Sequence, residues 1–193
     1  MSISITLHRS GTSRTEQVDT TTTGLDLFGS ERDVVAMRVD GILVDLQREL
    51  HDGAEVEPVE ATSEDGLNVI RHSCTHVMAQ AVQQLYPEVN LGIGPFITDG
   101  FYYDFGNIEP VTPEVLTELE KRMKRIVKEN QRFVRRVTSE ESAREELADQ
   151  PYKLELIGTK GKGADGASVE VGGAELTIYD NVRRNGEVAW KDL

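Results

Sequence analysis

The stretch EDGLNVIRHSCTHVMAQAVQQLYP, residues 64–87, predicts a long helix around which much of the fold is organised. Asp65 is suited to cap its start and Pro87 to end it near Tyr86. At roughly 100° per residue, one face carries the apolar side chains and is expected to face the core. These side chains are Leu67, Ile70, Cys74, Val77, Met78, Ala81, Val82 and Leu85.

A histidine pair lies on another side of the same helix. His72 and His76 are four residues apart, so they stack one turn apart, roughly 160° round the helix from Cys74. We expect both to point away from the core, into solvent or into a cleft.

The sequence after this helix alternates between short strands and helices. LGIGP (91–95) is followed by a hairpin pattern over 96–104 with Asp99-Gly100 at the turn. Thr112-Pro113-Glu114 begins a second helix. Its apolar stripe is Leu116, Leu119, Met123, Ile126 and Val127. Beyond it, the pattern predicts a short helix capped by Thr138 with Glu141 and ending near Ala148, a strand over 152–157, a glycine-rich loop over 158–173, and strands over 175–179 and 187–190.

The sequence before the central helix predicts a small α+β roll. A strand is expected over 3–7, a short helical piece over 25–28 and a further strand over 55–59. Asp40-Gly41 between apolar runs 34–39 and 42–44 is a strong hairpin signal. ATSEDG (61–66) reads as a linker, so we expect two domains, 1–63 and 64–193, in an α+β fold.

Composition narrows the class of protein. The 193 residues include 34 acidic and 21 basic side chains, for a net charge of −13. No run of about 18 apolar residues exists and the N-terminus has no secretory pattern, so we expect a cytoplasmic protein with no membrane partner. The single cysteine, Cys74, excludes an internal disulfide framework and is expected in the core.

One segment is basic in this acidic chain. Residues 121–136 hold eight basic side chains and one acid, Glu129. Such a cluster is suited to phosphate contacts, whereas a solvated helix face with intrahelical ion pairs is the alternative. The candidate contacts are Lys121, Arg122, Lys124, Arg125, Lys128, Arg132, Arg135 and Arg136.

The histidine pair admits several readings. Its spacing suits a shared metal ion or a shared activated water, and two surface histidines without a role share the same pattern. Cys74 lies on the opposite side of the helix, so one metal could not reach all three residues. We therefore expect no metal site built from this chain alone.

Four segments together resemble the N-terminal region of bacterial threonyl-tRNA synthetases in order and spacing: RHSCTH (71–76), LGIGP (91–95), DGFYYDF (99–105) and PYK (151–153). The resemblance implies a ubiquitin-like β-grasp module, called TGS, over 1–63. It implies an editing module over 64–193, with a central helix packed on an antiparallel sheet. The activity that the resemblance implies is removal of serine wrongly esterified to tRNA(Thr), by hydrolysis of the ester.

The resemblance also implies a site. His72, His76 and Lys153 match its catalytic residues, with His72 or His76 positioning or deprotonating water and Lys153 stabilising the oxyanion or the terminal adenosine. Tyr103 and Asp192 match positions that hold the seryl group, and Gly94 and Pro95 match the adjoining wall. The alternatives are a non-catalytic module that binds the tRNA acceptor stem and a zinc-dependent deacylase of the alanine type.

The family pattern continues beyond Leu193 into a Cys-x-Gly-Pro-His segment, so the editing site is expected to be incomplete in these 193 residues. ATP, Mg and zinc belong to the aminoacylation core of the whole family enzyme, and no cofactor is expected here. The resemblance implies tRNA(Thr) and seryl-tRNA(Thr) as partners, and a homodimer for the whole enzyme.

Overall fold

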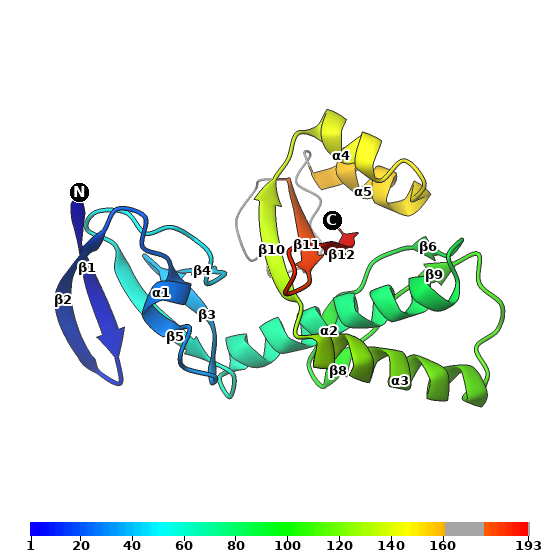
Figure 1. Ribbon diagram of the computed structural model, residues 1–193, viewed down its shortest axis with the longest axis horizontal. Coiled ribbons are helices and arrows are strands. Elements are labelled where there is room, and N and C mark those ends of the chain that lie inside the picture. The colour runs from blue at the N-terminus through cyan, green and yellow to red at the C-terminus, as the bar shows by residue number, and fades with distance from the viewer. Residues whose placement is uncertain (161–175, 193) are drawn as a thin grey trace. The chain divides into compact units, whose positions relative to one another are not determined.

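The computed structural model describes residues 1–160 and 176–192, which form two compact units (Figure 1). The described part of the first unit is residues 1–70, and the second begins at Arg71. The division falls within one continuous helix, α2 (Glu64–Leu85). The domain boundary expected at residues 63 and 64 lies at the start of that helix.

The first unit is a five-stranded mixed sheet with one short helix. The strand order is β2-β1-β5-β3-β4, in which β1 and β5 are parallel and the other neighbours antiparallel. This order is that of a β-grasp roll, and the α+β fold class is confirmed. The elements are β1 (Ser2–Arg9), β2 (Thr12–Asp19), α1 (Gly24–Phe28), β3 (Val34–Val39), β4 (Ile42–Val44) and β5 (Glu55–Glu60).

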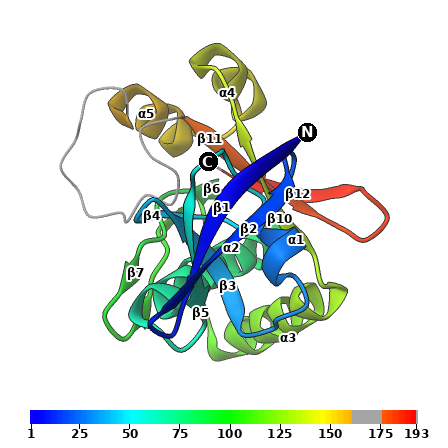
Figure 2. The same ribbon diagram turned by 90° about the vertical axis from the view of Figure 1, so that its left-hand side faces the viewer.

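The first unit contains two β-hairpins, and the sequence predicts only one of them. The predicted β3–β4 hairpin is confirmed, because Asp40 and Gly41 adopt φ values of 52° and 80° and pair Val39 with Ile42. The pairing of β1 with β2, which can be followed in Figure 2, is not predicted from apolar alternation, although Ser10 and Gly11 at its turn adopt similar φ values of 48° and 77°. Strand β2 (TSRTEQVD) is an exposed edge strand, so it needs no alternation of apolar side chains.

The first turns of α2 belong to the first unit. Val69 packs on a small cluster formed by Ala36, Leu43 and Val59 on the sheet. Leu67 and Ile70, which were expected in the core, are exposed. The apolar face of α2 is therefore displaced in its first turns from the face that spacing alone predicts.

The start of α2 is fixed by three local contacts. The side chain of Ser63, not Asp65, accepts a hydrogen bond from Gly66 N (3.1 Å), while Asp65 pairs with Arg38. A Cβ on residue 66 would lie 2.0 Å from the carbonyl oxygen of Glu60, so only glycine allows this close approach.

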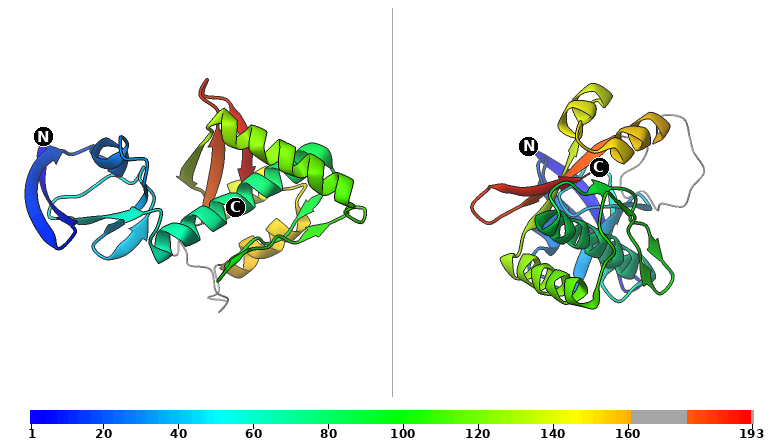
Figure 3. Two further views of the ribbon diagram at one scale, coloured as in Figure 1. Left: turned by 90° about the horizontal axis from the view of Figure 1, so that it is seen from below. Right: turned by 90° about the vertical axis from the view of Figure 1, so that its right-hand side faces the viewer.

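The second unit places α2 between helix α3 and a three-stranded antiparallel sheet, β10-β11-β12 (Figure 3). Val82 of α2, Ile126 of α3 and Trp190 of β12 belong to one buried cluster. The expected central helix on an antiparallel sheet is confirmed. The elements are β6 (Asn90–Leu91), β7 (Phe96–Ile97), β8 (Gly100–Phe101), β9 (Phe105–Gly106), α3 (Pro113–Glu129), β10 (Arg132–Val137), α4 (Glu140–Glu146), α5 (Pro151–Lys160), β11 (Thr177–Val182) and β12 (Val188–Asp192).

Helix α3 begins as predicted, with Thr112 as its cap and Pro113 at its first position. It ends at Glu129, because Asn130 turns into the left-handed region (φ 52°). Leu119 and Ile126 are buried, but Leu116 and Val127 of the expected stripe are exposed. The apolar stripe is thus narrower than the sequence pattern suggests.

The strand expected over 152–157 is wrong, because these residues form the first turns of α5. Leu154 N donates to Gln150 O (3.1 Å), which starts a helix at Pro151, where the absent N–H costs nothing. The buried side chains, Lys153 and Ile157, are four residues apart, which is a helical spacing.

Three smaller differences concern local elements. Ser139, not Thr138, caps α4. The β7–β8 hairpin turns at Thr98-Asp99, so Gly100 already belongs to the strand. Most of the glycine-rich loop expected over Gly158–Gly173 lies outside the described residues. Among the described helices, none has the length and apolar character needed to cross a lipid bilayer.

Candidate active site

Three polar side chains of the second unit meet around the carboxylate of Asp192. Lys153 Nζ lies 2.7 Å from Oδ1, Tyr103 Oη donates to Oδ2 (3.1 Å), and His76 Nδ1 lies 3.8 Å from Oδ2. Asp192 is only 2% exposed. Residues distant in sequence, on α2, α5, β12 and the segment before β9, therefore form one buried polar cluster.

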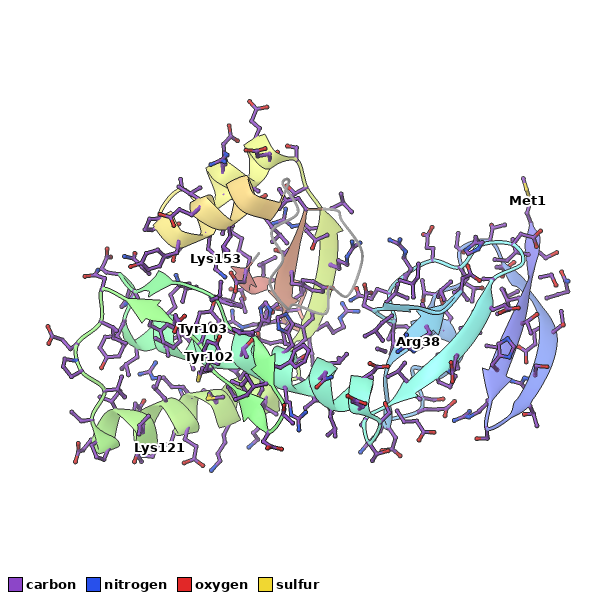
Figure 4. The ribbon with its side chains drawn as sticks, turned by 180° about the vertical axis from the view of Figure 1, so that it is seen from behind. Met1, Arg38, Tyr102, Tyr103, Lys121 and Lys153 are labelled. Carbon is purple, nitrogen blue, oxygen red and sulfur yellow. The ribbon has the colours of Figure 1, made fainter. Side chains whose placement is uncertain are left out.

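Lys153 is the positive charge of this cluster. Its side chain is buried, at 4% exposure for the residue, and Nζ also donates to Tyr103 Oη (3.2 Å). Figure 4 shows Tyr103 and Lys153 in the same region of the unit, with Lys121 apart from them on α3. Because burying an unpaired ammonium is costly, the ion pair with Asp192 is what allows a lysine at this position.

Tyr103 lies beside this polar cluster, and two neighbours fix the position of its ring. Its ring stacks on Phe105 with centroids 4.8 Å apart. A Cβ on Gly94 would lie 2.2 Å from a Tyr103 ring carbon, so glycine is required for this approach. Pro95, the residue after Gly94, accepts a hydrogen bond from the backbone of the preceding tyrosine, Tyr102 N (3.4 Å).

The environment of Tyr103 raises the pKa of its hydroxyl well above the usual value, first through burial and then through the negative charge of Asp192. The folded protein therefore holds this proton more tightly than the unfolded chain does. The free energy of unfolding should fall as pH rises above about 10, by up to about 1.4 kcal/mol per pH unit from this group.

This pH dependence is testable with urea unfolding between about pH 9 and about pH 11. We expect the stability of Tyr103→Phe to fall less steeply with pH than that of the wild type. Tyr102→Phe, a change at the exposed neighbour, should keep the wild-type slope. Equal slopes for wild type and Tyr103→Phe would show that Tyr103 is not perturbed.

The histidine pair lies beside the cluster. His72 Nε2 and His76 Nε2 are 3.2 Å apart, and the rings meet edge to face. His72 is exposed as expected. The expectation that His76 also points away from the core is wrong, because it is only 6% exposed and its ring lies near Phe133, Tyr179 and the core residue Trp190.

The burial of His76 follows from the position of α2. A helix packed on one side has a single buried face, but α2 packs against α3 on one side and the sheet on another. Each aromatic neighbour of His76 comes from a different strand of β10–β12. The spacing of residues along α2 cannot predict these neighbours, because they lie on other elements. The strand pattern of β12 could have indicated one of them, since Trp190 and Asp192 are two residues apart and so share a face.

Cys74 is half-buried, and burial raises the pKa of its thiol. It is thus less enclosed than the core position expected from the sequence. Among the residues that the structure describes, no three His, Cys, Asp or Glu side chains are grouped in a way that suits a metal ion.

The basic segment 121–136 does not form one surface. Its last three bases, Arg132, Arg135 and Arg136, lie on β10 rather than on the helix. Arg136 binds Glu146 and Asp180, and hydrogen bonds from Arg136 and Lys191 lower the pKa of Glu146 to about 2. Arg136 therefore acts in an ion-pair network.

The helical bases of this segment also differ from one another. Arg122 pairs with Glu118, and Lys124 with Glu120, as the solvated-face alternative expects. The exposed bases of α3 are Lys121, Lys124, Arg125 and Lys128.

Comparison with known proteins identifies the class. The chain is 95% identical over 193 residues to the threonine–tRNA ligase of Cutibacterium acnes, covering 100% of this chain and 28% of that protein. It is 62% identical over 184 residues to the enzyme of Streptomyces avermitilis and 59% over 181 residues to that of Pseudarthrobacter chlorophenolicus, covering 93% and 92% of this chain and 28% and 27% of those proteins. No family model matches the chain.

These matches show that the chain is part of an aminoacyl-tRNA synthetase, and its α+β fold is compatible with that class. The chain belongs to the threonyl-tRNA synthetase family, as the N-terminal region of such an enzyme, and the resemblance read from the sequence is confirmed. It spans about 28% of the length of the relatives it matches.

Proposed function

We propose that this region edits mischarged tRNA, by hydrolysing the ester between serine and tRNA(Thr). The observation that carries the proposal is the Asp192 cluster beside the histidine pair. It places a general-base candidate, a buried ammonium and a fixed aromatic wall within one site. General bases, charge stabilisation and a shaped pocket are what ester hydrolysis requires.

The need for such a site follows from substrate chemistry. Serine lacks only the methyl group of threonine, and one methyl group in a binding pocket discriminates by roughly 10- to 200-fold. A second pocket that excludes the larger side chain removes the errors. Tyr103 suits this purpose, because Gly94, Phe105 and the hydrogen bonds of its hydroxyl prevent its ring from yielding.

The histidine geometry suggests which residue meets the attacking water. His76 is buried, whereas His72 is exposed. The Asp192 carboxylate, 3.8 Å from His76 Nδ1, favours a proton on that nitrogen, which makes His76 Nε2 an acceptor. His72 Nε2–H then donates to it (3.2 Å), and His72 Nδ1 is the basic nitrogen.

In the proposed reaction, the base His72 takes a proton from water as the water oxygen bonds to the seryl carbonyl carbon. The carbonyl becomes an oxyanion, which the ammonium of Lys153 stabilises. Collapse of this intermediate breaks the ester bond, and the ribose oxygen leaves with the proton returned by His72. An ammonium has three hydrogens, and the contacts with Asp192 and Tyr103 use two of them.

The exposed bases of α3 are proposed to contact the phosphate backbone of the tRNA. Lys121, Arg125 and Lys128 lie along the helix. With Lys124 they are four of the eight basic residues that the sequence places in 121–136, and their positive charge is suited to phosphate contacts. The overall net charge of −13 does not oppose this contact, because the bases are gathered on one element.

The proposed function is tested with the complete synthetase. Seryl-tRNA(Thr) and threonyl-tRNA(Thr), prepared separately, are each incubated with the enzyme, and release of the amino acid is followed. We expect rapid hydrolysis of the seryl ester and slow hydrolysis of the threonyl ester. Hydrolysis of both at the rate seen without enzyme would refute the proposal.

A further inference from the structure

Gln150 is a buried amide that joins two segments of the site. It precedes α5 and is 5% exposed. Its Oε1 accepts from Leu91 N (2.8 Å), and its Nε2 donates to Val89 O (3.3 Å). The side chain thus bonds to the backbone around β6 as a neighbouring strand would.

These two hydrogen bonds satisfy backbone groups that water cannot reach. Val89 and Leu91 are 1% and 2% exposed. A buried N–H or carbonyl without a partner is destabilising, so the position of the amide is strongly determined. The backbone of Gln150 is held as well, by Leu147 O and Leu154 N (2.9 and 3.1 Å).

Each end of this connection leads to a residue of the Asp192 cluster. On one side, Gln150 leads directly into the first turn of α5, which carries Lys153. On the other side, Leu91 pairs with Phe105 of β9, two residues after Tyr103. The chain between Leu91 and Phe105 also contains Gly94.

A second contact docks α5 on the same ribbon. A Cβ on Gly106, in β9, would lie 2.7 Å from the ring and the hydroxyl of Tyr152. The absence of a side chain at Gly106 therefore lets the first turn of α5 approach β9 closely. Gln150 adds the directional part of this docking, since hydrogen bonds fix orientation as well as distance.

We propose that Gln150 is a positioning residue of the editing site, which sets where the Lys153 ammonium lies relative to Tyr103 and Asp192. This inference rests on the proposed function, because it takes Lys153 to be a group of the editing site. Lys153 Nζ must reach Asp192 Oδ1 (2.7 Å) and Tyr103 Oη (3.2 Å) together. A small displacement of α5 against the β6–β9 ribbon breaks one of these contacts.

The test uses Gln150→Met, which keeps the length and loses both hydrogen bonds, and Gln150→Glu, which keeps the acceptor for Leu91 N. Leu119→Ala is the matched control, because it removes buried side-chain atoms from the same hydrophobic cluster as Val89 and Leu91 but leaves both hydrogen bonds of Gln150 and the polar groups around Asp192 in place. The complete synthetase is assayed for seryl-tRNA(Thr) hydrolysis. We expect Gln150→Met to lower kcat at least about 10-fold with KM within about twofold, as misplacement of a reacting group predicts.

A second readout, on the 193-residue chain, does not depend on activity. Tyrosine absorbance is titrated to about pH 11, where Tyr103 should stay protonated in the wild type and in Leu119→Ala. Gln150→Met should show one further tyrosinate, because displacement of α5 exposes the Tyr103 hydroxyl to water and so relieves the burial that mainly raises its pKa. Gln150→Glu takes the place of Gln150→Met if the methionine variant does not fold.

The two readouts separate two failures. If Gln150→Met lowers stability as Leu119→Ala does, yet leaves the titration and kcat unchanged, Gln150 has only a structural role and the inference is wrong. If the wild-type synthetase does not hydrolyse seryl-tRNA(Thr), the proposed function fails, and the titration alone still decides whether Gln150 holds α5, and with it Lys153, against Tyr103.

Discussion

A threonyl-tRNA synthetase carrying His72→Ala should hydrolyse seryl-tRNA(Thr) about 10²- to 10⁴-fold more slowly than the wild type, which is the usual contribution of a positioned general base. His72 is exposed, so its removal leaves no large cavity, and the variant should fold normally. The loss should fall on kcat more than on KM, because the base acts in the transition state. Deacylation is measured from the decay of labelled seryl-tRNA under single-turnover conditions.

The matched control for His72→Ala is His51→Ala. His51 is also an exposed histidine with a neighbouring polar group, Asp40 Oδ2 at 3.0 Å, but it lies in the first unit. Its replacement should leave deacylation unchanged. Aminoacylation with threonine should be normal in both variants. Equal deacylation by wild type and His72→Ala would remove His72 from the mechanism, and the role of base would pass to another group.

Lys153→Met should lower the free energy of unfolding of the second unit by about 3–5 kcal/mol, because it leaves the Asp192 carboxylate buried without its cation. Asp192→Asn should cost a similar amount for the converse reason. The double variant, Lys153→Met with Asp192→Asn, should be more stable than the sum of the two losses predicts. This non-additivity distinguishes the ion pair from two independent packing contributions.

The free energy of unfolding of the second unit can be measured through the fluorescence of the only tryptophan, Trp190. Trp190 is buried in the core of the second unit, so its fluorescence during urea unfolding reports that unit. Lys191→Met is the control, because Lys191 pairs with Glu146 at a more exposed position and such pairs contribute about 0–1 kcal/mol. If Lys153→Met costs no more than Lys191→Met, the buried pair does not stabilise this unit.

The sequence predicted most strongly where local chemistry decides the structure. Asp40-Gly41 gave the β3–β4 hairpin and Thr112-Pro113 gave the start of α3. It failed over 152–157, where alternation of apolar residues suggested a strand. Pro151 and the spacing of Lys153 and Ile157 would have indicated the helix, but a lysine is not expected to be a buried residue.

The sequence predicted that some of the candidate residues would lie close together, but it did not predict how they are arranged. The family resemblance named Tyr103, Lys153 and Asp192, and the structure brings their polar atoms within hydrogen-bond distance. The burial of His76 could not be read from α2, because it depends on aromatic residues of three later strands. Gln150 gave no signal either, since its partners are backbone groups about 60 residues away.

The polar sequence of β2, which hid this strand from prediction, has a further consequence for the protein in a crowded cell. An edge strand presents unpaired backbone N–H and C=O groups that can template sheets between molecules. Along β2, the charged side chains of Arg14, Glu16 and Asp19 stand where alternating apolar residues would stabilise such pairing between molecules. The residues that conceal the strand thus protect the protein against aggregation through its open sheet edge.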